Sequence, residues 1–301
     1  MSDTNENKPP ETEVEAATPT TPETAAPADT TDQTRLVWRK ALPKWSLWLS
    51  LGVLVWFALA AFGPKIGVIP WQTGLGFMIR DAGIILIAVS MLFAIVAFLF
   101  AFFKTPRGPW WKAVLAFVIP LLLFLGLMTL RAQAAAVPPI HDVSTDLLDP
   151  PTFSAQTMAV REELGANPIN DYAIQLGQLD MWAGSEDEAL KTKNHADIIS
   201  EAYPELQPII IGDATQEQAF DAVVAAMGEI GLQDVRRVDG SNTIEGVAET
   251  FAFGFKDDVV ARIEDGQIDL RSVSRVGVSD LGYNAARLEE LREAIVSRLG
   301  Q

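Results

Sequence analysis

Three long apolar runs dominate the first half of the chain. They cover residues 46–62, 82–103 and 113–130, and none of them contains Asp, Glu, His, Lys or Arg. A helix needs about 20 predominantly apolar residues, within a range of roughly 17–25, to cross the hydrocarbon core of a bilayer. Tryptophans flank the first and third runs, which is typical of the interface between membrane and water. The pattern predicts a block of three membrane-spanning helices within residues 35–131.

From about residue 208, short apolar segments with the spacing of strands and helices follow one another. Residues 208–211 form a short β-run, and Asp213 is expected to cap a helix that Gly231 ends. Apolar positions at helical spacing return from about Tyr283 to Leu299. Asp-Gly pairs favour tight hairpins between four strands, which are expected near 234–238, 242–252, 257–264 and 267–276. Residues 137–301 are therefore predicted to form an α+β domain with an antiparallel sheet and helices on one face.

The first 34 residues carry neither pattern. They consist largely of Thr, Pro, Glu and Ala, with eight acids and one base. Such a segment cannot bury enough apolar surface to offset the roughly 1–2 kcal/mol of backbone entropy that ordering costs per residue. We predict that residues 1–34 are a disordered acidic tail.

Charge divides the chain into the same three parts. Residues 35–131 carry a net charge of +9, and residues 132–301 carry −18. Seven of the ten bases in the membrane block lie before the first apolar run or between the second and third, and three lie on the opposite side. Because Lys and Arg collect in cytoplasmic loops, we expect a multi-pass protein of a bacterial inner membrane, with a cytoplasmic N-terminus and a periplasmic C-terminal domain. An alternative is cleavage at the small residues 132–136, which would release that domain.

Composition narrows the chemistry further. The chain has no cysteine, so it has no disulfide, thiolate zinc site or cysteine nucleophile, and two histidines do not make a histidine-rich metal centre. We therefore expect no metal and no cofactor. The apolar runs lack the ionisable groups of an ion pathway. The lipid bilayer is an expected partner, whereas a domain with a net charge of −18 is a poor match for nucleic-acid phosphates.

The densest polar run lies in the last predicted strand. Asp269, Arg271 and Arg275 share one face of that strand. The two guanidiniums could pair with carboxylates, Asp269 among them, in an internal lattice, or they could grip an anionic ligand. We expect the lattice, with at least one arginine partly buried, and the anion site is the alternative. Further candidates for this cluster are Asp257, Asp258, Asp280 and Asn284.

The two histidines are expected in different settings. His141 is a candidate general base, and the alternative is a structural histidine that is hydrogen-bonded with Asp142 in the entry loop. His195 lies in a polar helical stretch, where we expect it on the solvated surface.

Several spaced motifs occur together in the C-terminal part. The runs 253–258, 271–277 and 280–284 follow one another, and residues 141–146 with Pro150-Pro151 precede them. Together they resemble the signature of a bacterial and plastid family, domain of unknown function 1499, in a membrane-anchored form. Val278 and Ala286 stand where that family often has basic residues. The resemblance implies the fold of the family and a membrane or envelope setting, and it implies no reaction.

Two hypotheses about function follow. The first is a multi-pass inner-membrane protein that displays an extracytoplasmic domain for binding or scaffolding in the cell envelope, with an envelope protein or an anionic ligand as partner. The second is a membrane-anchored hydrolase of an envelope lipid or glycan, which would use Asp257, Asp258 or Glu245 together with His141. We favour the first hypothesis, in which the protein is not an enzyme.

Overall fold

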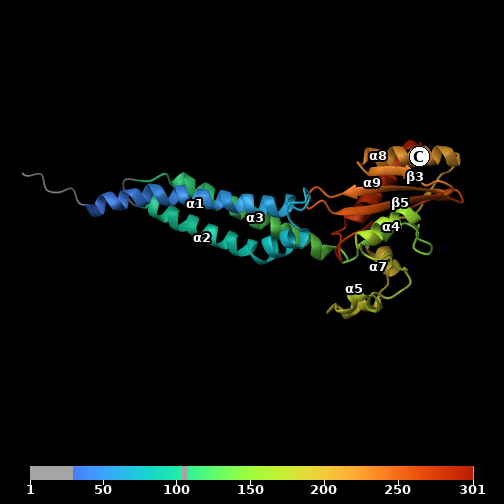
Figure 1. The fold of residues 1–301 in the computed structure, drawn as a ribbon, viewed down its shortest axis with the longest axis horizontal. Helices are drawn as coiled ribbons and strands as arrows, with labels where there is room; N and C mark the ends of the chain where they lie inside the picture. The colour runs from blue at the N-terminus through green and yellow to red at the C-terminus, as the bar shows by residue number, and fades with distance from the viewer. Residues whose placement is uncertain (1–29, 104–106, 301) are drawn as a thin grey trace, which may run out of the picture.

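The computed structural model describes residues 30–103 and 107–300 (Figure 1). Most of the predicted tail, residues 1–29, lies outside the described residues, while residues 30–34 belong to the first helix. Three helices, α1 (Thr30–Phe62), α2 (Gly83–Phe102) and α3 (Trp110–Ala136), are long and apolar enough to cross a membrane. The predicted block of three membrane-spanning helices is confirmed at this level.

The three helices pack through small side chains. The buried positions of α2 recur at spacings of three and four residues, and most of them carry Gly, Ala or Ser. Small residues let helix backbones approach closely in a membrane. The hydroxyl of Ser50 lies 2.8 Å from the hydroxyl of Ser90 and donates to the carbonyl of Ala116 at 2.5 Å. A single side chain of α1 is thereby linked to both α2 and α3.

A six-stranded antiparallel sheet forms the centre of the C-terminal domain. The strand order is β1, β6, β5, β4, β3, and β2 (Ile209–Ile210) pairs with β6 beside β1. A two-residue turn joins β5 to β6, as the sequence predicts. Its residues Asp265 and Gly266 both have positive φ, which is typical of a type I′ hairpin turn. The other strands are β1 (Asp142–Ser144), β3 (Gln233–Arg237), β4 (Thr243–Glu249), β5 (Lys256–Glu264) and β6 (Gln267–Ser274).

Helices lie against both faces of this sheet. The two long helices, α8 (Gln216–Glu229) and α9 (Tyr283–Arg298), share one face and cover the main apolar core, whereas α4 (Ala155–Glu163) lies on the other (Figure 1). The predicted α+β class is confirmed. The two long helices lie on one face of the sheet, as predicted, but α4 lies on the opposite face. Thr215, not Asp213, caps α8, because Thr215 and Gln218 form a reciprocal capping box.

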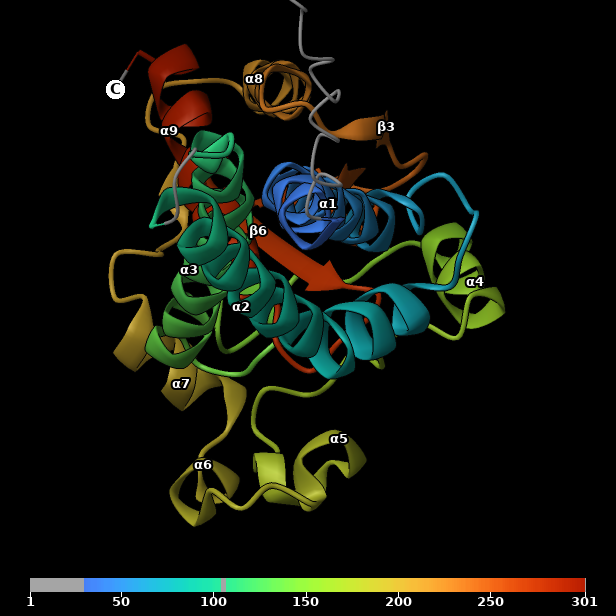
Figure 2. The same cartoon turned by 90° about the vertical axis from the view of Figure 1, so that its left-hand side faces the viewer.

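Four shorter helical segments lie between α4 and β2. They occupy one side of the domain, apart from α8 and α9 (Figure 2). Their bounds are η2 (Leu176–Gln178), α5 (Asp180–Ala183), α6 (Glu188–Thr192) and α7 (His195–Ala202).

The hairpin between β4 and β5 joins the domain to the membrane block. Strand β4 ends at Glu249, three residues earlier than predicted, because residues 250–255 turn away to pack on the end of α1. The amide of Phe253 donates to the carbonyl of Ala61 at 2.7 Å, and Lys65 Nζ lies 3.1 Å from Glu249 Oε1. The connection between α1 and α2, which includes the π-helix η1 (Gln72–Asp81), lies on the same side of the membrane block.

Candidate functional site

Arg271 and Asp142 form a buried, two-pronged ion pair on the α4 face of the sheet. Arg271 Nε donates to Asp142 Oδ1 at 2.9 Å and Arg271 Nη2 to Oδ2 at 2.7 Å. The hydroxyl of Tyr172 also donates to Oδ1, at 2.6 Å. Burial alone would raise the pKa of Asp142, but Arg271 outweighs it and holds that pKa below its usual value. Arg271 is therefore occupied internally, as the lattice interpretation predicts.

Asp258 accepts from two guanidiniums on the same face. Its carboxylate lies 2.5 Å from Arg161 Nη1 and 2.6 Å from Arg275 Nη2, and its side chain is only 1% exposed. Two positive charges on one carboxylate leave one uncompensated positive charge. Arg275 Nη1 donates to no other side chain or carbonyl within the described ranges, so this arginine keeps a donor for a further partner.

Asp269 has a different partner from the one that we expected. It binds Arg262, with Arg262 Nη2 2.9 Å from its Oδ2, and not Arg271 or Arg275. The sheet register explains the difference, because Arg262 stands directly opposite Asp269 on β5. Arg262 also reaches Asp146 and Asp149.

The other sheet face holds a second polar cluster beside α9. Asp257 pairs with Arg287 at 2.7 Å, and Asn284 binds the carbonyl of His141 and the hydroxyls of Ser272 and Ser274. Asp280 accepts from the amides of Gly282 and Asn284 at the start of α9, whose N-cap is Gly282, and forms no ion pair with an arginine within the described residues. Burial raises the pKa of Asp280, and the two amides offset this only in part. These residues hold α9 on the sheet.

Both histidines lie in a buried aromatic cluster. His195 is completely buried, so the expected surface position is wrong, because Asn194 caps α7 and turns the next side chain inward. The His195 ring stacks on Tyr172 at 5.3 Å, and the His141 ring stacks on Trp182 at 5.4 Å. The carboxylate of Asp142 binds Arg271 and Tyr172 and not His141, so the expected bond between His141 and Asp142 is absent from the described contacts.

Burial also changes how these rings titrate. It lowers the pKa of His195 to about 4, since the nearby Asp142 carboxylate offsets only part of the desolvation. It lowers the pKa of His141 as well. Neither ring nitrogen of either histidine has a hydrogen-bond partner of ordinary geometry within the described residues. His141 does not line the groove described next.

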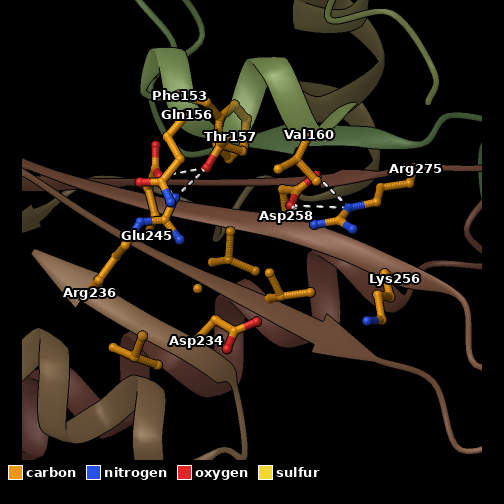
Figure 3. Close-up of a pocket in the computed structure, with 14 residues that line it drawn as sticks. Phe153, Gln156, Thr157, Val160, Asp234, Arg236, Glu245, Lys256, Asp258 and Arg275 are labelled. Atoms are coloured by element: carbon orange, nitrogen blue, oxygen red, sulfur yellow. Dashed lines mark hydrogen bonds and ion pairs between the residues drawn. The ribbon is translucent and has the colours of Figure 1, made fainter. Parts of the chain in front are cut away.

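A groove of about 580 Å³ runs between α4 and strands β3 to β5 (Figure 3). Its apolar lining includes Phe153, Val160, Val235 and Val247. Charged side chains mark its two ends. Glu245 and Glu249 are four residues apart on β4, and Glu249 is opposite Lys256, so the two ends are about 13 Å apart at roughly 3.3 Å per residue.

The groove lining holds three acids, Asp234 among them, and three bases, and the buried Arg161 beside Asp258 adds one positive charge near the Lys256 end. Lys256 is exposed and has no ion-pair partner within 4.0 Å in the described part of the chain. It lies next to Arg275, whose amide donates to the Lys256 carbonyl at 3.0 Å (Figure 3). At the far end, Arg236 binds Glu245 at 2.5 Å and Thr157 at 2.6 Å, which balances the charge there.

Sequence reasoning found only part of this site. Of the predicted cluster, Asp258 and Arg275 line the groove, while Arg271, Asp269, Asp257, Asp280 and Asn284 are structural. Arg161, Arg236 and Lys256 were missed. A signal existed for Arg161, because it is the only Lys or Arg between residues 132 and 190. Within the described residues, no group of three or more His, Asp or Glu side chains could hold a metal ion.

Comparison with known proteins gives one match. No curated protein and no solved structure matches the chain. The family model described as "Protein of unknown function (DUF1499)" matches residues 142–295, which is half of the chain and nearly all of the C-terminal domain. The resemblance seen in the sequence motifs is thereby confirmed. The chain belongs to the DUF1499 family, in a form with three candidate membrane helices ahead of the family domain.

Proposed function

We propose that this protein displays its C-terminal domain outside the cytoplasm and that the groove beside α4 binds an anionic organic ligand. The observation that carries the proposal is the cationic end of the groove. Lys256 is unpaired within the described residues, and Arg161 and Arg275 share the single carboxylate of Asp258.

The charge of the whole domain makes this end unusual. Residues 132–301 carry a net charge of −18, yet the group formed by Lys256, Arg275, Arg161, Asp258 and Asp234 carries +1. A local excess of one sign inside a concave site concentrates ions of the opposite sign. An anion that enters the groove therefore meets attraction at one end and repulsion from most of the surrounding surface.

The lining indicates an organic anion more than a bare inorganic one. Phe153, Val160 and Val247 give the groove an apolar wall, and Gln156 and Thr157 supply polar groups toward the far end. Apolar walls with a few placed polar groups are the usual composition of small-molecule sites. An organic phosphate or carboxylate satisfies both parts.

The hydrolase hypothesis receives no comparable support. Each of its candidate acids is bound to at least one guanidinium, so the carboxylate oxygens already have partners within the domain. The pairs are Asp257 with Arg287, Asp258 with Arg161 and Arg275, and Glu245 with Arg236.

Calorimetric titration of the detergent-purified full chain with phenyl phosphate tests the proposal. This probe combines a phosphate with an aromatic ring and stays in water. We expect one site, and Lys256→Gln should weaken binding about tenfold, as loss of about 1.4 kcal/mol from one charged contact predicts. The matched control is Lys191→Gln, which removes a partly exposed lysine of α6 that pairs with Glu188 and lies outside the groove lining. Equal affinities for the wild type and Lys256→Gln would refute the site.

A further inference from the structure

We propose that the ligand of the groove is the head group of an anionic membrane lipid whose acyl chains stay in the adjoining bilayer. This inference rests on the proposed anion-binding function and names the source of the anion. Three observations carry it: the height of the cationic end, the apolar surface beside it, and the polarity along the groove.

The cationic end lies at the height of lipid phosphates. Lys65 is three residues beyond Phe62, the last residue of α1, and its Nζ contacts Glu249 at 3.1 Å. Glu249 stands opposite Lys256 in the backbone register of β4 and β5. The polar layer of a bilayer extends about 5–8 Å beyond the hydrocarbon core on each side. Lys65 lies just beyond the end of a spanning helix and contacts the strand that faces Lys256. The Lys256 end of the groove is therefore expected to lie within that polar layer.

Exposed apolar side chains surround this end of the domain. Phe251, at the tip of the hairpin, is 81% exposed and packs edge to face against Phe62 of α1 at a ring distance of 5.3 Å. Ile66 and Val68 in the neighbouring loop are also well exposed. These side chains continue the apolar surface of a spanning helix, which fits immersion in lipid better than exposure to water. The occupant of this surface is therefore the bilayer.

The polarity of the groove sets the direction of the lipid. Drawing an acyl chain out of the bilayer costs about 0.8 kcal/mol for each CH₂ group. The far end of the groove, about 13 Å away, offers Arg236, Thr157 and Gln156, which suit hydroxyl groups better than a chain. Arg236 Nε and Nη1 donate to no described residue. A lipid phosphate at Lys256 and Arg275 would meet positive charge, and its polar head group would point toward Arg236. In this orientation the acyl chains stay in the membrane.

Single-cysteine labelling tests how close the β4–β5 hairpin lies to the bilayer, since the chain contains no cysteine of its own. Phe251→Cys and Leu148→Cys would each carry an environment-sensitive fluorophore in full-length protein reconstituted into vesicles. Leu148 is 99% exposed and lies near Arg262, toward the opposite end of β5 from the hairpin. Nitroxide-labelled lipids should quench the label at position 251 at least fivefold more than the label at 148. Equal quenching would overturn the placement of the hairpin in the bilayer.

Native mass spectrometry tests the lipid itself. Full-length protein in detergent would receive equal amounts of phosphatidylglycerol and phosphatidylcholine, with soluble glycerophosphoglycerol as competitor. We expect about tenfold preferential retention of phosphatidylglycerol, its loss in Lys256→Gln and its persistence in Lys191→Gln. The competitor should be needed at about 100-fold higher concentration, since the detergent micelle around the helices holds the lipid beside its site, whereas the competitor stays in water.

Two other outcomes separate the inference from the function on which it rests. If glycerophosphoglycerol and phenyl phosphate bind as tightly as the lipid, with the same dependence on Lys256, the groove is an anion site and the lipid source is overturned. If none of these molecules depends on Lys256, the lipid source and the proposed function both fail.

Discussion

Removing Arg271 should destabilise the domain more than removing Arg275, although the two side chains lie on the same face of β6. Asp142 is completely buried and has Arg271 as its guanidinium partner, with Tyr172 as its other described side-chain donor. Asp258 is equally buried, but it keeps Arg161 when Arg275 is lost. The two variants therefore differ in whether they leave a buried carboxylate without a positive partner.

The expected magnitudes follow from that difference. Breaking a buried ion pair by removing one partner costs roughly 3–5 kcal/mol, so Arg271→Ala should lose about that much. Arg275→Ala should lose about 1–3 kcal/mol, the value of charged hydrogen bonds without a stranded charge. Arg271→Lys should recover little, because Lys lacks the planar fork that binds both oxygens of Asp142. The double variant Asp142→Leu with Arg271→Met should be more stable than Arg271→Met alone, because it removes both charges together.

Urea denaturation of residues 137–301 measures these effects. Trp182 is the only tryptophan of that segment and is 2% exposed, so its fluorescence reports loss of the core. With a slope of about 2 kcal/mol per M, Arg271→Ala should lower the midpoint by about 2 M, against about 1 M for Arg275→Ala. An unchanged midpoint for Arg271→Ala, or a larger drop for Arg275→Ala, would refute the assignment of the buried pair.

Two more predictions concern orientation and pH. Alkaline phosphatase fused after residue 150 should be active and a fusion near residue 106 inactive, because the loop charges favour a periplasmic domain; the reverse pattern would place the domain in the cytoplasm. Since the pKa of His195 falls from 6.5 to about 4 on folding, the unfolded chain binds more protons between these values, and stability should drop as pH falls from 7 to 4, by roughly 3 kcal/mol from this group. Thermal unfolding of His195→Phe should show a flatter pH dependence, and an unchanged slope would contradict this origin.

The architecture was largely predictable because its signals are local. Three charge-free runs, two Asp-Gly hairpins and the apolar spacing of the last helix each act within about 20 residues, so the membrane block, β5–β6 and α9 appear near their expected positions. The end of β4 was misjudged, since residues 250–252 are compatible with a strand. They leave the sheet because the end of α1, far away in the chain, offers Ala61 and Lys65 as partners.

The site was only partly predictable because its partners come from distant segments. Face alternation correctly placed Arg271 and Arg275 together, but it could not supply Asp142 or Arg161, which arrive from β1 and α4. Likewise, the polarity around His195 suggested a solvated helix. The burial of that ring depends on Tyr172 and Trp182, whose positions follow from irregular segments without a periodic pattern.

The bond from Phe253 to Ala61 also bears on how the protein is made. The carbonyls in the last turn of a helix have no partner within the helix, and here an amide of the C-terminal domain supplies one for α1. These two residues are 192 positions apart in the sequence. At a synthesis rate of about 5–20 residues per second, the partner emerges from the ribosome roughly 10–40 s after the helix that it completes. Until then, water at the membrane surface has to satisfy the carbonyl of Ala61. The contact between the end of α1 and the β4–β5 hairpin is therefore a late event in the synthesis of this protein.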